Sequence, residues 1–439
     1  MSTRSTLIKN AKLFPGVENG LVADMIENAC ILIKDDRFFF IGQERDLPPG
    51  NQGHVMDAAG MLLMPALVNA HTHSAMTLLR GVGAEQPLEK WLNHYIFPLE
   101  EQLRAEQARA GVMLAMLEHI ASGVTTINDM YMFPEETARV VADTGTRAMI
   151  SNACVDFGNG EAQLADALAF YQDYHGAAEG RIRASVSVHA EYTTTPALIK
   201  NVIRATQGLD NIQHLHLSET QHEVKACLKR HGASPVSYFH DLGLFEGPTI
   251  AAHCVAVNER DLELLALDRV TVAHTSISNL KLGSGVAPVP KMMAHGIPLA
   301  IATDGAASND NLDLWEELKL TTLLHKGLGH DATLVSPAQT LEAATLGGAR
   351  ALGFDRLGLI REGWLADCVL LDLDMPNTLP AYDVLSTIAY AAGSRNVRMT
   401  MSSGRILFRD GEYLTIDAKE AKTMARQAAC QLHGGVSGA

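Results

Sequence analysis

Hydrophobic and polar positions follow two different patterns along the chain. Near both ends, short β-like runs alternate with turns. These runs lie at residues 29–33, 38–41, 54–56, 367–373, 397–401 and 406–408. Residues 418–431 have the pattern of a helix. We expect the two β-rich ends to pair into one small β-sandwich domain, followed by a C-terminal helix.

Between these ends, apolar or β-branched runs recur, each followed by polar residues and a helical stretch. The runs lie at residues 62–70, 124–128, 147–153, 184–189, 212–217, 249–253, 270–274 and 297–303. Eight such units predict an α/β fold, a (β/α)₈ TIM-like barrel. A doubly wound open sheet is the competing fold, but phosphate-binding glycine fingerprints are missing. The expected domains are residues 1–64, 65–361 and 362–439: sandwich, barrel, and the second part of the sandwich with its helix.

Composition narrows the class of protein. Of 439 residues, 47% are hydrophobic and 19% are charged, which is typical of a globular chain. A net charge of -15 argues against a nucleic-acid partner. The six cysteines form no CxxC pair, which favours reduced thiols. Without an apolar leader or a membrane-length run, we expect a cytoplasmic location and no membrane association.

Polar residues end six of the eight runs, at the face where barrels carry their active sites. The set comprises His71 with His73, His189, His216, His253, His274 and Asp304. Alternation along a strand lets His71 and His73 point to the same side. Imidazole nitrogens plus a carboxylate suit zinc or a similar cation, with a position left for water.

Single residues carry separate expectations. His71, His73 and Asp304 are metal-ligand candidates, and His216 is preferred over His214 because it lies closer to the strand end. His274 is either a structural hydrogen-bonding residue or a catalytic group. Glu219, three residues after His216, is expected to move protons over the barrel mouth, and the alternative is a residue that stabilises a helix N-terminus.

These residues resemble the amidohydrolase superfamily. The resemblance rests on PALVNAHTH at 65–73, His189, HLSE at 216–219, His253 with Cys254, and TDG at 303–305. His189 stands where binuclear members have a bridging lysine, so the likeness is to mononuclear deaminases. The segments HSAMTLLRG at 73–81, Trp91-Leu92, FPLE at 97–100 and TDGAASN at 303–309 are similar to the family of 5-methylthioadenosine/S-adenosylhomocysteine deaminases.

The resemblance implies a role for each site residue. His71, His73, His216 and Asp304 would bind one Zn²⁺ per chain, with Fe²⁺ or Mn²⁺ as other metals. Glu219, His253 and Asp304 would be catalytic, acting on a water that the metal acidifies. Glu100 would take the ribose hydroxyls, and His189, Glu219 and Asp304 would also contact the substrate. Barrels of this type commonly pair, so a homo-oligomer is expected.

The implied reaction is hydrolytic deamination of an adenine nucleoside at C6. The family's proline-tyrosine pair after the strand-four histidine is replaced here by Ala190-Glu191-Tyr192, and no Lys or Arg occurs between Arg147 and Arg181. A homocysteine carboxylate would therefore meet no positive charge there, which favours 5′-methylthioadenosine as the substrate, with adenosine or S-adenosylhomocysteine as further substrates.

Three rival functions stay open. The first is hydrolysis of a free base or a triazine, for which Glu100 would have no ribose to bind. The second is a metal-dependent amidase or ring-opening hydrolase. The third is a non-catalytic scaffold. Trp91 either lines a thioalkyl pocket or packs a loop.

Overall fold

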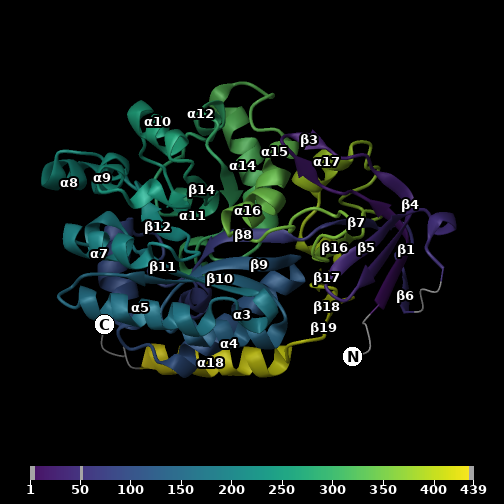
Figure 1. Ribbon diagram of the computed structural model, residues 1–439, viewed down its shortest axis with the longest axis horizontal. Coiled ribbons are helices and arrows are strands. Elements are labelled where there is room, and N and C mark those ends of the chain that lie inside the picture. The colour runs from purple at the N-terminus through teal and green to yellow at the C-terminus, as the bar shows by residue number, and fades with distance from the viewer. Residues whose placement is uncertain (1–4, 50–52, 435–439) are drawn as a thin grey trace.

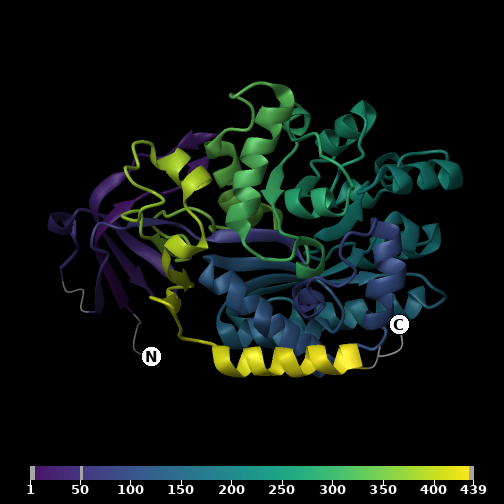
Figure 2. The ribbon, with the colours of Figure 1, turned by 180° about the vertical axis from the view of Figure 1, so that it is seen from behind.

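The computed structural model describes residues 5–49 and 53–434. A strand-rich unit built from both chain ends lies beside a larger α/β unit (Figure 1). The C-terminal helix α18 (Ala418–Gly434) runs along the base of the larger unit, packed on α3 (Ala105–Ala121), as the view from behind also shows (Figure 2). The last helix of the chain therefore packs on the larger unit.

Both chain ends contribute to one nine-stranded sheet, in the order β19-β18-β17-β16-β7-β1-β4-β5 with β6 paired to β1. Its strands are β1 (Ser5–Leu13), β4 (Ile26–Lys34), β5 (Arg37–Gly42), β6 (His54–Asp57), β7 (Leu62–Pro65), β16 (Cys368–Leu371), β17 (Val397–Ser402), β18 (Arg405–Arg409) and β19 (Glu412–Tyr413). The two chain ends meet where β16 pairs with β7. The predicted pairing of the β-rich ends is confirmed.

The larger unit contains eight parallel strands in two sheets of four, β11-β10-β9-β8 and β12-β13-β14-β15. Their bounds are β8 (Leu67–Thr72), β9 (Val124–Met130), β10 (Arg147–Cys154), β11 (Ile182–Val188), β12 (Gln213–Leu217), β13 (Thr249–His253), β14 (Thr271–His274) and β15 (Leu299–Ile301). Parallel neighbours need long crossovers, and helices supply them. The fold is therefore α/β with parallel sheets.

Hydrogen bonds connect the two four-stranded sheets at both seams. At one seam, the Asp304 N–H donates to the His71 carbonyl over 3.0 Å. At the other, the His216 N–H donates to the His189 carbonyl over 2.9 Å. Because all eight strands are parallel, their C-terminal ends lie on one face, where these four residues gather.

The α-helices lie between strands along the chain, except α18, which follows the last strand. They are α1 (Leu88–Trp91), α2 (Phe97–Glu100), α3, α4 (Pro134–Thr144), α5 (Gly160–Tyr174), α6 (Ala177–Gly180), α7 (Pro196–Thr206), α8 (Gln221–His231), α9 (Pro235–Asp241), α10 (Glu259–Leu267), α11 (Ser276–Lys281), α12 (Val289–Ala294), α13 (Ala306–Asn309), α14 (Leu314–Gly329), α15 (Pro337–Glu342), α16 (Gly348–Ala351), α17 (Val384–Ser386) and α18. Across residues 5–49 and 53–434, none combines the length and apolar character needed to cross a membrane.

The first predicted run, residues 62–70, is two strands rather than one. Its first half is β7, which pairs with β16 of the nine-stranded sheet, whereas its second half is β8 of the parallel sheet. The change of partner falls at Pro65, which ends β7 and has no N–H to donate. The last predicted run, residues 297–303, is also shorter than expected, since β15 spans Leu299–Ile301.

A buried ion pair joins the start of β10 to the nine-stranded sheet. Arg147 Nη2 lies 3.4 Å from Asp367 Oδ1, and both residues are at most 3% exposed. The Asp367 carboxylate also accepts hydrogen bonds from the Ser402 hydroxyl at 3.0 Å and the Ser403 N–H at 2.8 Å. Removing one partner of such a pair leaves a buried charge without compensation.

We therefore predict that Asp367→Ala lowers the free energy of unfolding by about 3–5 kcal/mol. The exposed Arg409–Asp410 pair, at 3.4 Å, provides a matched control. Asp410→Ala should cost less than about 1 kcal/mol. Both are measured by urea denaturation followed by circular dichroism. Equal losses of unfolding free energy in Asp367→Ala and Asp410→Ala would show that burial of the Arg147–Asp367 pair adds nothing to stability.

Candidate metal and active site

The chain brings imidazoles together at the C-terminal ends of its parallel strands. His71 lies in β8 and His73 directly after it, His216 lies in β12, and His253 is the last residue of β13. His71 and His253 are almost fully buried, and His73 is partly exposed. Each of these histidines therefore lies at the C-terminal end of a parallel strand.

Each of these rings is fixed through its Nδ1 atom. His73 Nδ1 lies 2.5 Å from the Met130 carbonyl, and His216 Nδ1 lies 3.2 Å from the His189 carbonyl. A carbonyl only accepts, so Nδ1 carries a proton in both rings, and Nε2 is the nitrogen left to bind a cation. Against the effect of burial, the Asp304 carboxylate raises the pKa of His73 to about 9, so a bound cation would have to displace a proton from His73 Nε2. His71 Nδ1 lies 2.8 Å from the Nε2 atom of His214.

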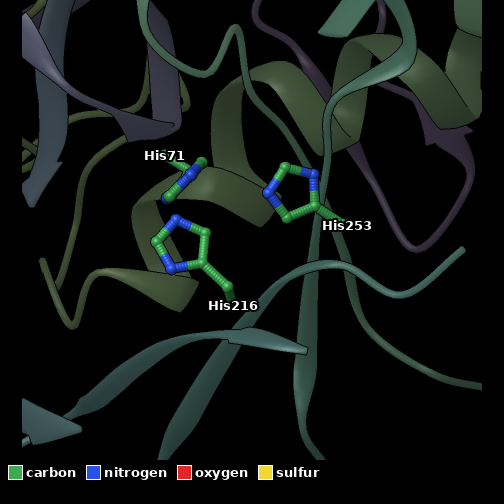
Figure 3. Close-up of side chains that lie close together, drawn as sticks. All are labelled: His71, His216 and His253. Atoms are coloured by element: carbon green, nitrogen blue, oxygen red, sulfur yellow. The ribbon is translucent and has the colours of Figure 1, made fainter. Parts of the chain in front are cut away.

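The Nε2 atoms converge on the carboxylate of Asp304. Its Oδ1 lies 3.3 Å from His71 Nε2 and 3.2 Å from His73 Nε2. Ligand atoms of His71, His73 and Asp304 lie within 4.8 Å of one another, as do those of His71, His216 and His253. Figure 3 shows the rings of this second group turned toward a common centre. His71 belongs to both groups, which therefore form one cluster.

The donor atoms of this cluster match those of a cation-binding site. His216 Nε2 and His73 Nε2 lie 3.3 Å apart, and His73 Nε2 lies 3.2 Å from the Asp304 carboxylate. His71 Nε2 is buried and has no hydrogen-bond partner among the described residues. Three unprotonated imidazole nitrogens and one carboxylate are the donor set of a mononuclear zinc site. The arrangement is a His/Asp metal-binding group.

Asp304 is held ionised and in one orientation. Its Oδ2 accepts hydrogen bonds from the hydroxyls of Ser278 at 2.6 Å and Ser308 at 2.8 Å. Its Oδ1 accepts the Gly305 N–H at 2.8 Å. Burial alone would raise the pKa of Asp304, but the imidazoles of His71 and His73 beside its carboxylate hold it well below its usual value.

Several residues at this face have left-handed backbones, among them Ser218, His253 and Asp304. Ser218 follows β12 with φ +49°, His253 ends β13 with φ +73°, and Asp304 follows β15 with φ +64°. Such conformations cost non-glycine residues on the order of 1–3 kcal/mol each. The His253 ring is further fixed by Asn279 Oδ1 and Thr275 Oγ1, both 2.9 Å from its Nδ1. Strained backbone conformations therefore occur at three strand ends that carry polar residues of the site.

Glu219 lies beside the cluster as a buried carboxyl group. Its Oε2 is 3.8 Å from His253 Nε2, and its Oε1 accepts a hydrogen bond from the Ser284 hydroxyl at 3.4 Å. Burial raises the pKa of Glu219, which favours its protonated form. Glu223 of α8 accepts the N–H groups of Ser218 and Glu219, so the start of this helix fixes the backbone that carries Glu219.

Glu100 and His189 border the cluster. Glu100 ends α2, and its Oε1 accepts a hydrogen bond from the Tyr131 hydroxyl at 2.7 Å. The Tyr131 ring lies 6.2 Å from the His73 ring, so Tyr131 lies between the Glu100 carboxylate and the histidine cluster. Burial raises the pKa of Glu100. The His189 ring is 4.5 Å from the His216 ring, and burial lowers the pKa of His189 to about 3, so it is neutral.

Two residues with open roles lie outside the cluster. His274 is buried, and its Nε2 lies 2.9 Å from the Ser276 hydroxyl, which fits the structural alternative. Trp91 packs among apolar residues that include Met76 and Leu79, and its indole N–H donates to the Val82 carbonyl at 2.9 Å. Trp91 therefore packs a loop.

Sequence reasoning overlooked several side chains that touch site residues. Tyr131 directly follows β9, so the rule that located the histidines at strand ends could have found it. Ser308 lies inside the 303–309 segment, but its type gave no sign that it contacts Asp304. Ser278 and Ser284 lie after β14, in segments whose sequence pattern did not indicate a functional site.

Comparison with known proteins places this site in a family. The profile of the Amidohydrolase family matches residues 62–407. The 5′-deoxyadenosine deaminase of Methanothermobacter thermautotrophicus is 39% identical over 417 residues, covering 94% of this chain and 97% of the relative. The 5-methylthioadenosine/S-adenosylhomocysteine deaminase of Moorella thermoacetica is 40% identical over 417 residues, with 94% and 96% covered.

A solved structure agrees with these relatives. The crystal structure of an adenosine deaminase from Xanthomonas campestris, with bound Zn, superposes with a TM-score of 0.93 at 33% identity, covering 98% of this chain and 99% of that one. The resemblance drawn from the sequence motifs is confirmed, and the chain belongs to the Amidohydrolase family.

Proposed function

We propose that this protein is a metal-dependent aminohydrolase that deaminates an adenine nucleoside at C6, converting 5′-methylthioadenosine to 5′-methylthioinosine and ammonia. The observation that carries the chemistry is the convergence of imidazole Nε2 atoms and the Asp304 carboxylate beside a buried Glu219. The substrate class rests on relatives named 5′-deoxyadenosine deaminase and 5-methylthioadenosine/S-adenosylhomocysteine deaminase, which match over nearly the whole chain.

One divalent ion per chain is part of the proposal, with His71, His73, His216 and Asp304 as its ligands. Zinc is favoured by the donor set and by the zinc-containing structural neighbour, and Fe²⁺ or Mn²⁺ are the alternatives. A cation held there supplies Lewis acidity, which lowers the pKa of water toward neutrality.

The protein's own groups would then handle protons. Asp304, fixed by the hydroxyls of Ser278 and Ser308, accepts the proton of the attacking water. Glu219, whose pKa burial raises, delivers a proton to N1 of the purine as the water oxygen attacks C6. Asp304 then passes its proton to the amino nitrogen, the C6–N bond breaks and ammonia leaves, while the new C6 hydroxyl returns a proton to Glu219 as the carbonyl forms. His253, held through its Nδ1, orients that water or stabilises the oxygen that bonds to C6.

This role predicts that Glu219→Gln retains bound zinc but loses about 10²–10⁴-fold in kcat on 5′-methylthioadenosine. Glutamine keeps the size of the side chain but has no carboxyl proton to transfer. Deamination is followed by the adenine-to-hypoxanthine absorbance change, and zinc by elemental analysis. The exposed Glu263→Gln is the control and should match the parent protein. Full turnover by Glu219→Gln would remove Glu219 from the mechanism.

The remaining contacts define the substrate. Tyr131 holds one oxygen of Glu100, which leaves the other carboxylate oxygen for the ribose hydroxyls. His189, Glu219 and Asp304 contact the purine side. The loop after β10 carries Asp156 and an exposed Phe157, and no Lys or Arg occurs between Arg147 and Arg181. A neutral 5′ group such as methylthio or hydroxyl therefore fits beside this loop better than the charged homocysteine group.

The ribose role predicts a substrate-dependent defect. Glu100→Gln should lower kcat/KM for adenosine about 10- to 100-fold, because a hydrogen bond to a charged group is lost. The same variant should leave kcat/KM for 2′,3′-dideoxyadenosine unchanged, since that nucleoside has no hydroxyls to bind. Glu101→Gln, an exposed neighbour on the chain, is the matched control. Equal losses on both nucleosides would assign Glu100 a role unrelated to ribose.

The proposal also covers the barrel, the domain boundaries, the oligomeric state and the cellular location. The two four-stranded sheets adjoin at both seams and would act as one closed (β/α)₈ barrel. The nine-stranded sheet would form the β-sandwich domain, with boundaries at 64/65 and 361/362; residues 1–4, 50–52 and 435–439 lie outside the described part. Homo-oligomerisation, a cytoplasmic location and the absence of a nucleic-acid partner remain predictions.

A further inference from the structure

His214 is a buried histidine that the proposed mechanism does not use. It lies in β12, two residues before His216, and its side chain is inaccessible to solvent. Both of its ring nitrogens have polar partners: Nε2 lies 2.8 Å from His71 Nδ1, and Nδ1 lies 2.9 Å from the hydroxyl of Ser151. Its backbone N–H donates to the Ser187 hydroxyl at 2.9 Å.

The direction of these hydrogen bonds follows from what His71 must do. A neutral imidazole has one donor and one acceptor nitrogen. If His71 binds a cation through Nε2, its proton is on Nδ1 and is donated to His214 Nε2. His214 then carries its own proton on Nδ1 and donates it to Ser151. The chain His71, His214, Ser151 therefore fixes two tautomers at once.

His71 differs in this respect from the other two proposed histidine ligands. His73 and His216 donate to the backbone carbonyls of Met130 and His189, which no substitution can remove. His71 depends on a side chain. That side chain comes from the opposite half of the parallel strands, because His71 and Ser151 lie in β8 and β10 whereas His214 lies in β12. Without it, the His71 ring can rotate or move its proton to Nε2, which cannot then bind a metal.

We propose that His214, supported by Ser151, is the positioning residue that fixes the tautomer and orientation of His71 and thereby sets the affinity of the metal site. The inference rests on the proposed function only in taking His71 as a ligand. It makes no use of the substrate. Partners of this kind typically change metal affinity by about 10- to 100-fold when they are removed.

Zinc affinity, measured by competition with a chromogenic chelator, tests this directly. His214→Leu removes the acceptor and should weaken zinc binding about 10- to 100-fold. His214→Gln keeps an acceptor oxygen near the position of Nε2 and should restore most of the affinity. Ser151→Ala leaves the His214 ring without its second partner and should weaken zinc binding less than His214→Leu. Melting of the metal-free proteins shows whether each variant folds.

The outcomes are distinguishable. Unchanged zinc affinity in His214→Leu, or equal weakening in His214→Leu and His214→Gln at equal melting temperatures, would overturn the inference. If His214→Leu does not fold, the comparison of Ser151→Ala and His214→Gln with the parent decides: parental affinity in Ser151→Ala, or strong weakening in His214→Gln, overturns it. Failure of the parent protein to bind zinc would instead contradict the proposed metal site.

Discussion

Hydrogen bonds to the Nδ1 atoms of the site histidines are the constraint on which the rest of the site depends. They hold the rings of His73 and His216 in the tautomer that directs an Nε2 lone pair inward. Without them, each ring could turn or shift its proton, and the cluster would relax by internal hydrogen bonding. With them, the Nε2 atoms of His71 and His73 are held 3.3 and 3.2 Å from the Asp304 carboxylate, where one cation can bind all three groups.

The backbone conformation at the strand ends also helps to hold the site residues in place. Ser218, His253 and Asp304 adopt left-handed backbones where β12, β13 and β15 end. Each conformation is unfavourable by itself and persists because the surrounding contacts determine it. Asp304 illustrates this: its N–H donates to the His71 carbonyl across a seam while its carboxylate accepts from two serines. The same contacts that join the two parallel sheets therefore orient the groups proposed to act in catalysis.

The sequence located the parallel strands and the polar residues at their ends, because apolar runs and the residues that follow them are local features. It chose His216 over His214 from position alone, and the cluster includes His216. It did not reveal that residues 62–70 serve two sheets, since a continuous apolar run does not show where its pairing partner changes. The Nδ1 partners were equally hidden: carbonyls of Met130 and His189 exist at every residue and become specific only in three dimensions.

The central claim is that one cation, held by this cluster, supports deamination of an adenine nucleoside. A titration of metal-free protein with zinc, at fixed excess of 5′-methylthioadenosine, tests it most directly by following the adenine-to-hypoxanthine absorbance change and released ammonia. The account predicts a rate that rises linearly and reaches a plateau at one zinc per chain. A rate that does not depend on zinc, a break at two ions per chain, or no deamination with zinc bound would contradict it.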